Sequence, residues 1–336
     1  MNIVKMNVEE WFEKYKFKCE SFRDIKRLVT IKKEKKLKIS VVIPTLNEEA
    51  TVGKVISAIK KPLMDQNKLI DEILVVDSGS TDDTKKVAEA NGAKFYLSEK
   101  YLKSEGKAKG KGENLWKSVY LAEGDIICWI DADIKNIHPR FVYGLIGPLL
   151  VHDDIKFTKA FYQRPIKVGE ELVPLGGGRV TELTARPLFN MYFPRLSGFI
   201  QPLSGEYAGK REILEKIPFF TGYGVETAML IDLVKKFGLR ACAQVDLKRR
   251  VHRNQELPSL SKMAFGILQV FAKRANSLGK LILVRDIKHK LRIIEHNIKG
   301  EYNIKRLQIM EKERPPMIIV DEYRKKFKVE PSWVYV

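Results

Sequence analysis

The first half of the chain alternates short β-branched runs with helical patterns, and this alternation limits the folds that it can adopt. Strands are expected at residues 39–43, 73–76, 93–97 and 126–130, with helices at about 48–60, 82–91 and 112–122. Parallel strands need a crossover between them, and a helix usually supplies it. The pattern therefore predicts an α/β fold with a mixed, mostly parallel sheet flanked by helices.

Polar side chains gather where the expected strands end. The three pairs are Asn47 and Glu48, Asp77 and Ser78, and Asp131 and Asp133. In open α/β sheets, ligands bind outside the carboxyl ends of the strands. We therefore expect these side chains to lie along one crevice.

Asp131-Ala132-Asp133 directly follows the apolar run 126–130. Two aspartates in this spacing at a strand end can both reach a hard cation, and Mg²⁺ and Mn²⁺ take carboxylate oxygens while leaving sites for phosphate. A turn or a helix cap is the alternative.

The turns after the first two strands allow two interpretations. Asn47 or Thr81 could cap a helix, and helix N-termini also favour anions. Asp77 stands at the exit of its strand, where its carboxylate could accept hydrogen bonds from a nucleobase or ribose.

Two glycine-rich segments are candidates for binding anions. Lys111 lies between Gly110 and Gly112, where it could follow a phosphate as a point charge or be a solvated lysine. Gly178 ends a glycine triplet and Arg179 follows it, which suits close backbone approach and a bidentate contact with phosphate or carboxylate. A plain loop-to-helix turn would explain the second segment equally well.

Glu226 and His252 are candidates in the second half. Glu226 opens an apolar helix, where the helix dipole favours an acidic residue in the first turn, and its carboxylate is also a candidate for contact with a ligand. His252 stands between Arg250 and Arg253, in either a basic surface strand or a site that it completes with an aspartate. A histidine would suit manganese better than oxygen ligands alone.

The two ends of the chain predict helices. Residues 1–37 have the pattern of a charged helical appendage with an apolar stripe, and the last 60 or so residues look helical and rich in lysine. We divide the chain into this appendage, halves at 38–156 and 157–275, and a C-terminal extension at 276–336. The extension offers a surface for a homodimer.

Composition narrows the class of protein. The longest apolar run is too short to span a membrane, and the N-terminus does not resemble a signal peptide, so we expect a cytoplasmic protein without membrane attachment. Three distant cysteines argue against a disulfide framework. The net charge of +19 fits solvated lysines or an anionic partner. We expect no nucleic acid partner, because no reading motif is present, and keep a basic nucleic-acid-binding protein as a distant alternative.

Three segments resemble the nucleotide half of GT-A fold glycosyltransferases: VVIPTLNEE (41–49), ILVVDSGSTDDT (73–84) and IICWIDADI (126–134). Four more resemble glucosyl-3-phosphoglycerate synthases, which are retaining enzymes related to mannosyl-3-phosphoglycerate synthases. They are GKGENLW (110–116), GGGRVTELTARPLFN (176–190), GYGVETAMLID (222–232) and RRVHRNQ (249–255). The resemblance spans about residues 39 to 275.

The resemblance implies that glucose moves from a nucleoside diphosphate glucose, with uridine favoured, to 3-phosphoglycerate. GDP-mannose as the donor is the alternative. A sugar nucleotidyltransferase is disfavoured, because Pro44-Thr45-Leu46-Asn47 stands where its glycine- and arginine-rich loop would lie. Front-face attack is expected, in which the leaving phosphate oxygen takes the acceptor's proton.

The resemblance also assigns residues to roles. Asp133 and His252 would bind Mg²⁺ or Mn²⁺, and Glu226 and Asp133 would be catalytic. The acceptor would contact Gly178, Arg179, Val180, Thr181 and Asn254. The nucleotide-sugar would contact Pro44, Thr45, Leu46, Asn47, Glu48, Asp77, Ser78, Lys111, Asp131, Ala132, Tyr223, Gly224, Val225, Glu226, Arg250 and Arg253.

Overall fold

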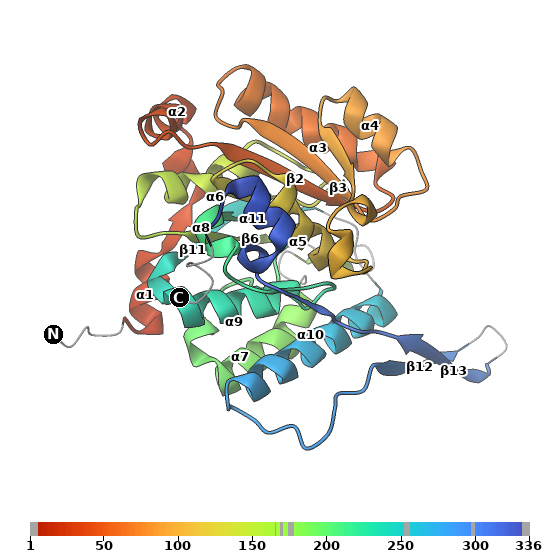
Figure 1. Ribbon diagram of the computed structural model, residues 1–336. Helices are drawn as coiled ribbons and strands as arrows, with labels where there is room; N and C mark the ends of the chain where they lie inside the picture. The colour runs from red at the N-terminus through yellow and green to blue at the C-terminus, as the bar shows by residue number, and fades with distance from the viewer. Residues whose placement is uncertain are drawn as a thin grey trace.

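A computed structural model describes residues 6–164, 166–168, 171–173, 178–251, 256–296 and 300–330 (Figure 1). Its centre is an eight-stranded sheet in the order β1-β11-β6-β9-β5-β2-β3-β4. The strands are β1 (Lys16–Lys18), β2 (Ile39–Thr45), β3 (Glu72–Asp77), β4 (Lys94–Leu97), β5 (Ile126–Trp129), β6 (Phe157–Gln163), β9 (Tyr207–Lys210) and β11 (Cys242–Arg249). Strand β9 is antiparallel to β5 and β6, while the other neighbours are parallel. The predicted mixed, mostly parallel sheet is confirmed.

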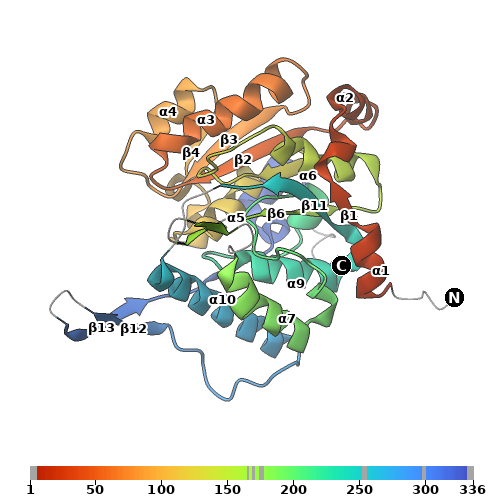
Figure 2. The same ribbon diagram turned by 180° about the vertical axis from the view of Figure 1, so that it is seen from behind.

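Helices cover the sheet on both sides, because its central strands are apolar on both faces. In Figures 1 and 2, α3 and α4 lie above the sheet, and α7, α9 and α10 lie below it. The helices between β2 and β11 are α3 (Glu49–Lys60), α4 (Thr84–Ala90), α5 (Lys111–Leu121), α6 (Arg140–Val151), α7 (Arg186–Tyr192), α8 (Arg211–Leu214) and α9 (Val225–Phe237). The alternation predicted for the first half is therefore confirmed. None of the helices in the described ranges has the length and apolarity that a bilayer crossing requires.

The N-terminal segment belongs to the main body. It forms α1 (Val8–Lys14), β1, a 3₁₀ turn at Cys19–Phe22 and α2 (Ile25–Glu34). Strand β1 pairs in parallel with β11, and the indole Nε1 of the fully buried Trp11 donates a hydrogen bond to the Cys242 carbonyl at 2.8 Å. The prediction of a separate, purely helical appendage is therefore wrong. Its apolar stripe packs into the core, and its second element is an edge strand of the sheet.

The C-terminal segment is also different from the predicted helical extension. Helix α10 (Leu257–Ser277) is followed by β12 (Lys290–His296), β13 (Tyr302–Gln308), β14 (Glu313–Arg314), a 3₁₀ turn at Met317–Ile319 and the short α11 (Asp321–Phe327). Strands β12 and β13 pair as an antiparallel hairpin that projects from the body (Figures 1 and 2). The β-branched residues Ile293, Ile294 and Ile304 favour strands over helix.

Two further small sheets complete the fold. Strand β14 pairs antiparallel with β10 (Phe219–Phe220), and so places the C-terminal segment against the start of α9. Strands β7 (Ile166–Val168) and β8 (Glu171–Val173) form a two-stranded ribbon after β6.

Candidate active site

A cavity of about 460 Å³ opens at the carboxyl ends of the central strands. Its lining includes residues that end or follow β2, β3, β5 and β6, as the position of ligand sites in open α/β sheets predicts. The second half of the chain closes the cavity with the start of α9, the segment 178–181 and the side of α10. The predicted crevice at the strand ends is therefore present.

One end of the cavity is formed by the two turns expected to meet a nucleotide. Pro44, Thr45, Leu46 and Glu48 line it together with Ser78. The expected residue Asn47 does not line the cavity. Its backbone has a left-handed φ of 57°, and its side-chain oxygen accepts a hydrogen bond from the Thr81 amide at 2.9 Å. Asn47 thus joins the two turns and does not cap a helix, because the N-cap residues of α3 and α4 are Glu48 and Asp83.

Asp77 does not line the cavity, and its suggested contact with a nucleobase or ribose stays a prediction. The side chain is 1% exposed, and Oδ1 accepts hydrogen bonds from the amides of Gly79 and Ser80. Its other oxygen accepts from the hydroxyls of Thr45 and Ser80. Both carboxylate oxygens therefore stabilise the turn that presents Ser78.

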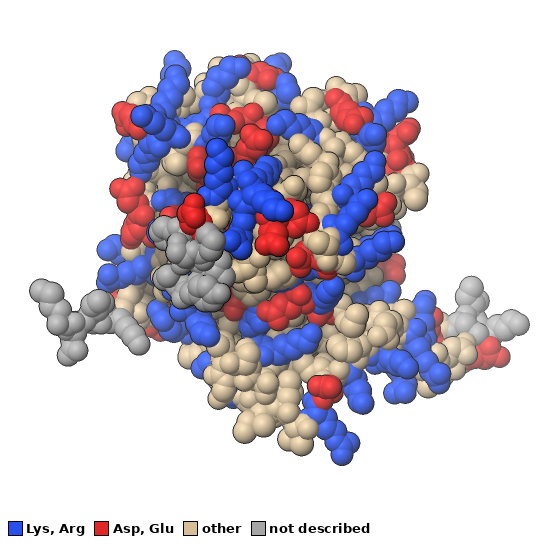
Figure 3. Space-filling view, viewed as in Figure 1, with Lys and Arg blue, Asp and Glu red and all other residues tan. Residues whose placement is uncertain are grey.

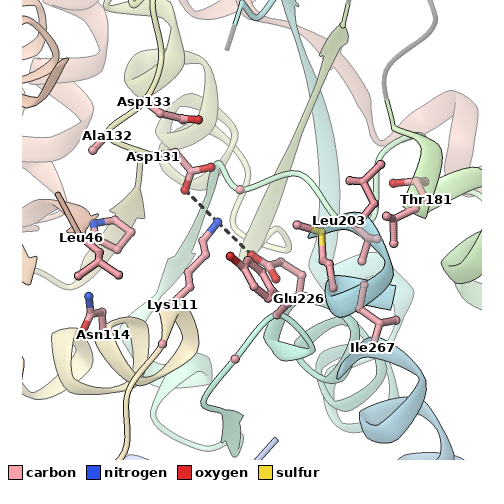
Figure 4. A pocket seen from close by; sticks show the side chains of 18 of the residues that line it. Leu46, Lys111, Asn114, Asp131, Ala132, Asp133, Thr181, Leu203, Glu226 and Ile267 are labelled. Atoms are coloured by element: carbon pink, nitrogen blue, oxygen red, sulfur yellow. Dashed lines mark ion pairs between the residues drawn. The ribbon is translucent and has the colours of Figure 1, made fainter. Parts of the chain in front are cut away.

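Lys111 stands at the centre of the cavity between two carboxylates (Figure 4). Its Nζ lies 2.8 Å from Asp131 Oδ1 and 3.2 Å from Glu226 Oε1. Burial lowers the pKa of Lys111, but attraction to these carboxylates outweighs burial and holds it well above its usual value. Burial raises the pKa of Asp131, yet the charges of Lys111 and Arg250 bring it below its usual range. Both groups are therefore charged at neutral pH.

The glycines beside Lys111 allow close packing. A Cβ at Gly112 would lie 1.8 Å from the Phe220 carbonyl oxygen, and Gly110 has a φ of 126° with the Thr221 oxygen 2.5 Å from its Cβ position. Lys111 is also the first residue of α5. The lysine is thus fixed by its neighbours and is not the solvated lysine that the sequence left as an alternative.

Arg250 forms ion pairs with both aspartates. Its Nη2 lies 3.0 Å from Asp131 Oδ2 and 2.9 Å from Asp133 Oδ1, while Nε lies 2.9 Å from Glu206 Oε1. Glu206 is fully buried and accepts a hydrogen bond from the Tyr162 hydroxyl at 2.5 Å. The sequence did not single out Glu206 or Tyr162, because nothing local marks their approach to Arg250.

Asp133 provides the donor chemistry of a divalent metal site. Burial raises its pKa beyond what the attraction of Arg250 offsets, and the charge of Asp131 raises it further. A divalent cation would stabilise this pair of carboxylates, whose hard oxygens suit Mg²⁺ or Mn²⁺. Within the described ranges no group of three or more His, Cys, Asp and Glu residues gathers. The predicted ligand His252 lies outside those ranges.

The segment predicted to bind the acceptor lines the opposite side of the cavity. Gly178, with a φ of 87°, precedes Arg179, Val180 and Thr181, and all four line the cavity. The chain then runs through a π-helical turn at Thr181–Ala185 into α7. Asn254 and Arg253, also predicted contacts, lie outside the described residues.

The start of α9 contributes two of its four predicted residues to the cavity. Tyr223 and Glu226 line it, whereas Gly224 and Val225 do not. Val225 is fully buried in the core, and a Cβ at Gly224 would lie 2.2 Å from Val270 on α10. Gly224 and Val225 therefore pack internally, and their expected contacts with the donor stay predictions.

The sequence analysis missed several lining residues. Ala132 was predicted and lies in the cavity wall, but Asn114, Arg164 and Gly205 were not. Arg164 directly follows β6, so the strand-end rule could have found it. An apolar wall was also missed, because its residues come from a loop and from one face of α10: Leu203, Leu260, Met263 and Ile267.

A charged cavity at the strand ends of this sheet defines a nucleotide-sugar transferase of the GT-A type. Residues 40–167 match the model of glycosyl transferase family 2. The glucosyl-3-phosphoglycerate synthase of Petrotoga mobilis is 53% identical over 317 residues, which cover 94% of this chain and 97% of that protein. The chain belongs to the glucosyl-3-phosphoglycerate synthase family.

Solved structures agree with this assignment. The mannosyl-3-phosphoglycerate synthase of Rubrobacter xylanophilus has a TM-score of 0.84 and 38% identity, and the match covers 92% of this chain and 98% of that one. The glucosyl-3-phosphoglycerate synthase of Mycobacterium tuberculosis, solved with Mn²⁺, UDP and glucosyl-3-phosphoglycerate, has a TM-score of 0.76 and 41% identity, covering 87% and 94%.

Proposed function

We propose that this chain transfers glucose from UDP-glucose to 3-phosphoglycerate in a reaction that depends on Mg²⁺ or Mn²⁺. One observation carries the proposal: Lys111 is held between Asp131 and Glu226 inside the cavity. The turns expected to bind a nucleotide line one end of this cavity, and the glycine-arginine segment 178–181 lines the other. Structures of the Mycobacterium tuberculosis relative hold UDP-glucose with phosphoglyceric acid, and Mn²⁺ or Mg²⁺ beside UDP.

Each side of the cavity has its own task in this proposal. Pro44 to Glu48 and Ser78 would hold the uridine, and Lys111 would meet the diphosphate as a fixed positive charge. Asp133, together with His252, would bind the divalent ion, which neutralises charge as UDP leaves. Tyr223 and Glu226 would face the glucose.

The acceptor side would supply a phosphate and carboxylate clamp. Gly178 presents backbone at a left-handed φ, which allows close approach of an anion, and Arg179 offers a planar fork for bidentate contacts. Val180, Thr181 and Asn254 would complete this side. The 2-hydroxyl of the acceptor would then point towards the sugar.

The reaction needs positioning more than a protein base. The bond between the anomeric carbon and the β-phosphate oxygen breaks, and the acceptor hydroxyl oxygen forms the new bond on the same face. The hydroxyl proton passes to the leaving phosphate oxygen. Glu226 stabilises the positive charge that develops at the anomeric carbon, because its carboxylate is fixed beside Lys111 in a largely enclosed site.

The second candidate function uses GDP-mannose as the donor, and the fold match to the Rubrobacter xylanophilus mannosyl enzyme favours it. The test offers UDP-glucose and GDP-mannose separately with 3-phosphoglycerate and identifies the product by mass and sugar analysis. We expect glucosyl-3-phosphoglycerate from UDP-glucose. Product from GDP-mannose alone would replace the proposal with the mannosyl function.

We also propose a homodimer and a cytoplasmic location. Strands β12 and β13 project from the body and expose Ile294, Tyr302 and Ile304, each at least 60% exposed, which is a surface that a second copy could cover. The three cysteines are free and buried, as suits a reducing compartment. Light scattering on the purified chain tests the dimer, and a monomer at micromolar concentration would contradict it.

A further inference from the structure

The segment Glu311–Pro315, here called the strap, runs between the β12–β13 hairpin and the last helix. It lies outside residues 39 to 275, the part of the chain that the sequence motifs span. Phe219 and Phe220 pair with Arg314 and Glu313, and the Thr221 amide donates to the Lys312 carbonyl at 2.9 Å. The strap therefore lies directly against the residues that lead into α9.

Glu311 binds the backbone at the edge of the cavity. Its Oε2 accepts a hydrogen bond from the Gly222 amide and its Oε1 accepts one from the Tyr223 amide, both at 2.9 Å. Glu311 is 3% exposed, and it is not among the residues that line the cavity. A buried carboxylate placed at the N-terminus of a helix satisfies amides that have no partner within the helix. Here these amides belong to two residues that line the cavity.

The Glu311 carboxylate packs closely against two glycines. A Cβ at Gly222 would lie 2.2 Å from Glu311 Oε1, and one at Gly266 would lie 2.6 Å from the same oxygen. Gln269 and Lys273 on α10 hold the strap backbone, since Gln269 accepts from the Glu311 amide at 3.3 Å and Lys273 donates to the Glu311 carbonyl at 3.0 Å. The carboxylate is thus fixed from both sides.

The other end of the strap fixes the segment that leads to Lys111. Arg314 forms a bidentate, fully buried pair with Glu113 at 2.7 and 2.8 Å, and it also donates to the carbonyls of Glu105 and Gly106. Glu113 is in the first turn of α5, two residues after Lys111. The Glu113 amide in turn donates to the Thr221 carbonyl at 3.0 Å. One short segment therefore connects the starts of α5 and α9.

We propose that the strap is the positioning element for the sugar side of the site, and that Glu311 is its positioning residue. Glu311 fixes the backbone position of Gly222 and Tyr223. Through the start of α9, it also fixes the distance between Glu226 and Lys111. The inference rests on the proposed function, in which Tyr223 and Glu226 face the donor sugar. The nucleotide end, from Pro44 to Glu48, and the acceptor segment, from Gly178 to Thr181, make none of these strap contacts among the described residues.

The test compares two variants of the strap in the full-length protein. Glu311→Gln keeps the size of the side chain but turns one acceptor into a donor that faces a backbone amide. Glu313→Gln is the matched control, because Glu313 lies two residues away and pairs with Arg274, which is not among the lining residues. Glu311→Ala serves as a second variant, in which the carboxylate is removed altogether.

The readout is the ratio of the Kd for UDP-glucose to the Kd for UDP, measured by calorimetry with Mn²⁺ present. We expect this ratio to rise by about 10-fold in both Glu311 variants, because loss of charge-assisted hydrogen bonds disturbs only the sugar side. In steady-state transfer we expect kcat/KM for UDP-glucose to fall by a similar factor, with the KM for 3-phosphoglycerate unchanged. Glu313→Gln should leave both quantities as in the wild type.

Two results would overturn the inference. An unchanged ratio with wild-type affinities in folded Glu311 variants would show that Glu311 only stabilises the fold. An unchanged ratio with an equal loss of affinity for UDP and UDP-glucose would place its effect on the UDP part that both ligands share. The binding ratio does not depend on 3-phosphoglycerate, so a wild-type chain that binds both nucleotides but transfers no glucose would contradict the proposed function and still test the strap.

Discussion

At the scale of single residues, the site is a chain of buried and partly buried charges that offset one another. Glu206, Arg250, Asp131, Lys111 and Glu226 follow each other at 2.8 to 3.2 Å. Each charge loses solvation on burial, and the opposite charges beside it compensate for that loss. The fixed dipoles and charges that result are what a reaction that separates charge requires.

In the proposed function, Asp133 is the residue on which metal binding depends. Asp133→Ala removes the more exposed carboxylate of the pair and should lower kcat/KM by about 100-fold or more, with the thermal unfolding temperature little changed. Asp65→Ala is the control, since Asp65 pairs with Lys60 away from the cavity. Retained activity with an unchanged metal requirement would remove Asp133 from the metal site.

Arg179 is expected to act on the acceptor. Arg179→Ala should raise the KM for 3-phosphoglycerate by about 10- to 100-fold, as expected for the loss of a charge-assisted contact, and should leave the KM for UDP-glucose nearly unchanged. Arg195→Ala is a surface control away from the lining residues. A change confined to the donor KM would assign Arg179 to the nucleotide-sugar instead.

Buried Lys159 should make the stability of the fold depend on pH. It is 1% exposed, its Nζ has no hydrogen-bond partner within the described part of the chain, and burial lowers its pKa to about 7. Between pH 7 and the ordinary lysine pKa of 10.5, Lys159 is protonated in the unfolded chain but largely neutral in the folded chain. The unfolded chain therefore binds more protons than the folded chain, so Lys159 makes the free energy of unfolding rise with pH across this window.

Lys159→Met should therefore raise the unfolding temperature at pH 7 by about 2 °C or more, and the gain should shrink towards pH 10. The control is Lys117→Met, because buried Lys117 is paired with Glu113 and with the Ser98 carbonyl, so its replacement should not stabilise the fold. A gain that is independent of pH would contradict the interpretation of Lys159.

At the scale of elements, local patterns predicted those strands and helices whose signal lies within their own residues. Strands β2 and β3 are apolar runs, and α3 and α4 follow them with the expected bounds to within a residue or two. The short edge strand β1 has no such pattern: two of its three residues are lysines, and it exists because Lys16–Lys18 pair with Gln244–Asp246. Long-range pairing of this kind has no local signature.

The site follows the same division. Positions at strand ends were found from the sequence, as Pro44, Ser78 and Asp131 show. Glu206 and Glu311 were not, because their roles depend on contacts with Arg250 and with the Gly222 amide, each far away in the sequence. Asp77 was assigned to the ligand because its turn could not be distinguished from a ligand site without coordinates.

The element-scale prediction concerns α1 and β1. Trp11→Ala should lower the free energy of unfolding by about 3–5 kcal/mol, because it removes a fully buried indole. The centroid of this ring lies 4.7 Å from that of the Phe199 ring. Phe12→Ala, at the partly buried neighbouring position, should cost clearly less. Denaturant titration measures both. Equal, small effects would mean that the N-terminal segment is not part of the cooperative core.

At the scale of the whole molecule, the charge of +19 is not gathered into one stripe on the face seen in Figure 3. Lysines and arginines spread over this face, with acidic residues between them. The basic side chains that meet ligands in our account are instead few and lie in the cavity: Lys111, Arg164, Arg179 and Arg250. Four carboxylates line the same cavity, Glu48, Asp131, Asp133 and Glu226, so the anionic ligands would meet individual cations and not a net positive charge.

The measurement that tests this account most directly is UDP release from UDP-glucose by the wild-type chain, with 3-phosphoglycerate, in the presence of chelator and after Mg²⁺ or Mn²⁺ is added back. The account predicts turnover that requires 3-phosphoglycerate, disappears with chelator and returns with either ion. UDP release that continues at full rate in excess chelator would contradict the metal site at Asp133. A lack of release under every condition, from a chain that still binds UDP, would contradict the proposed acceptor.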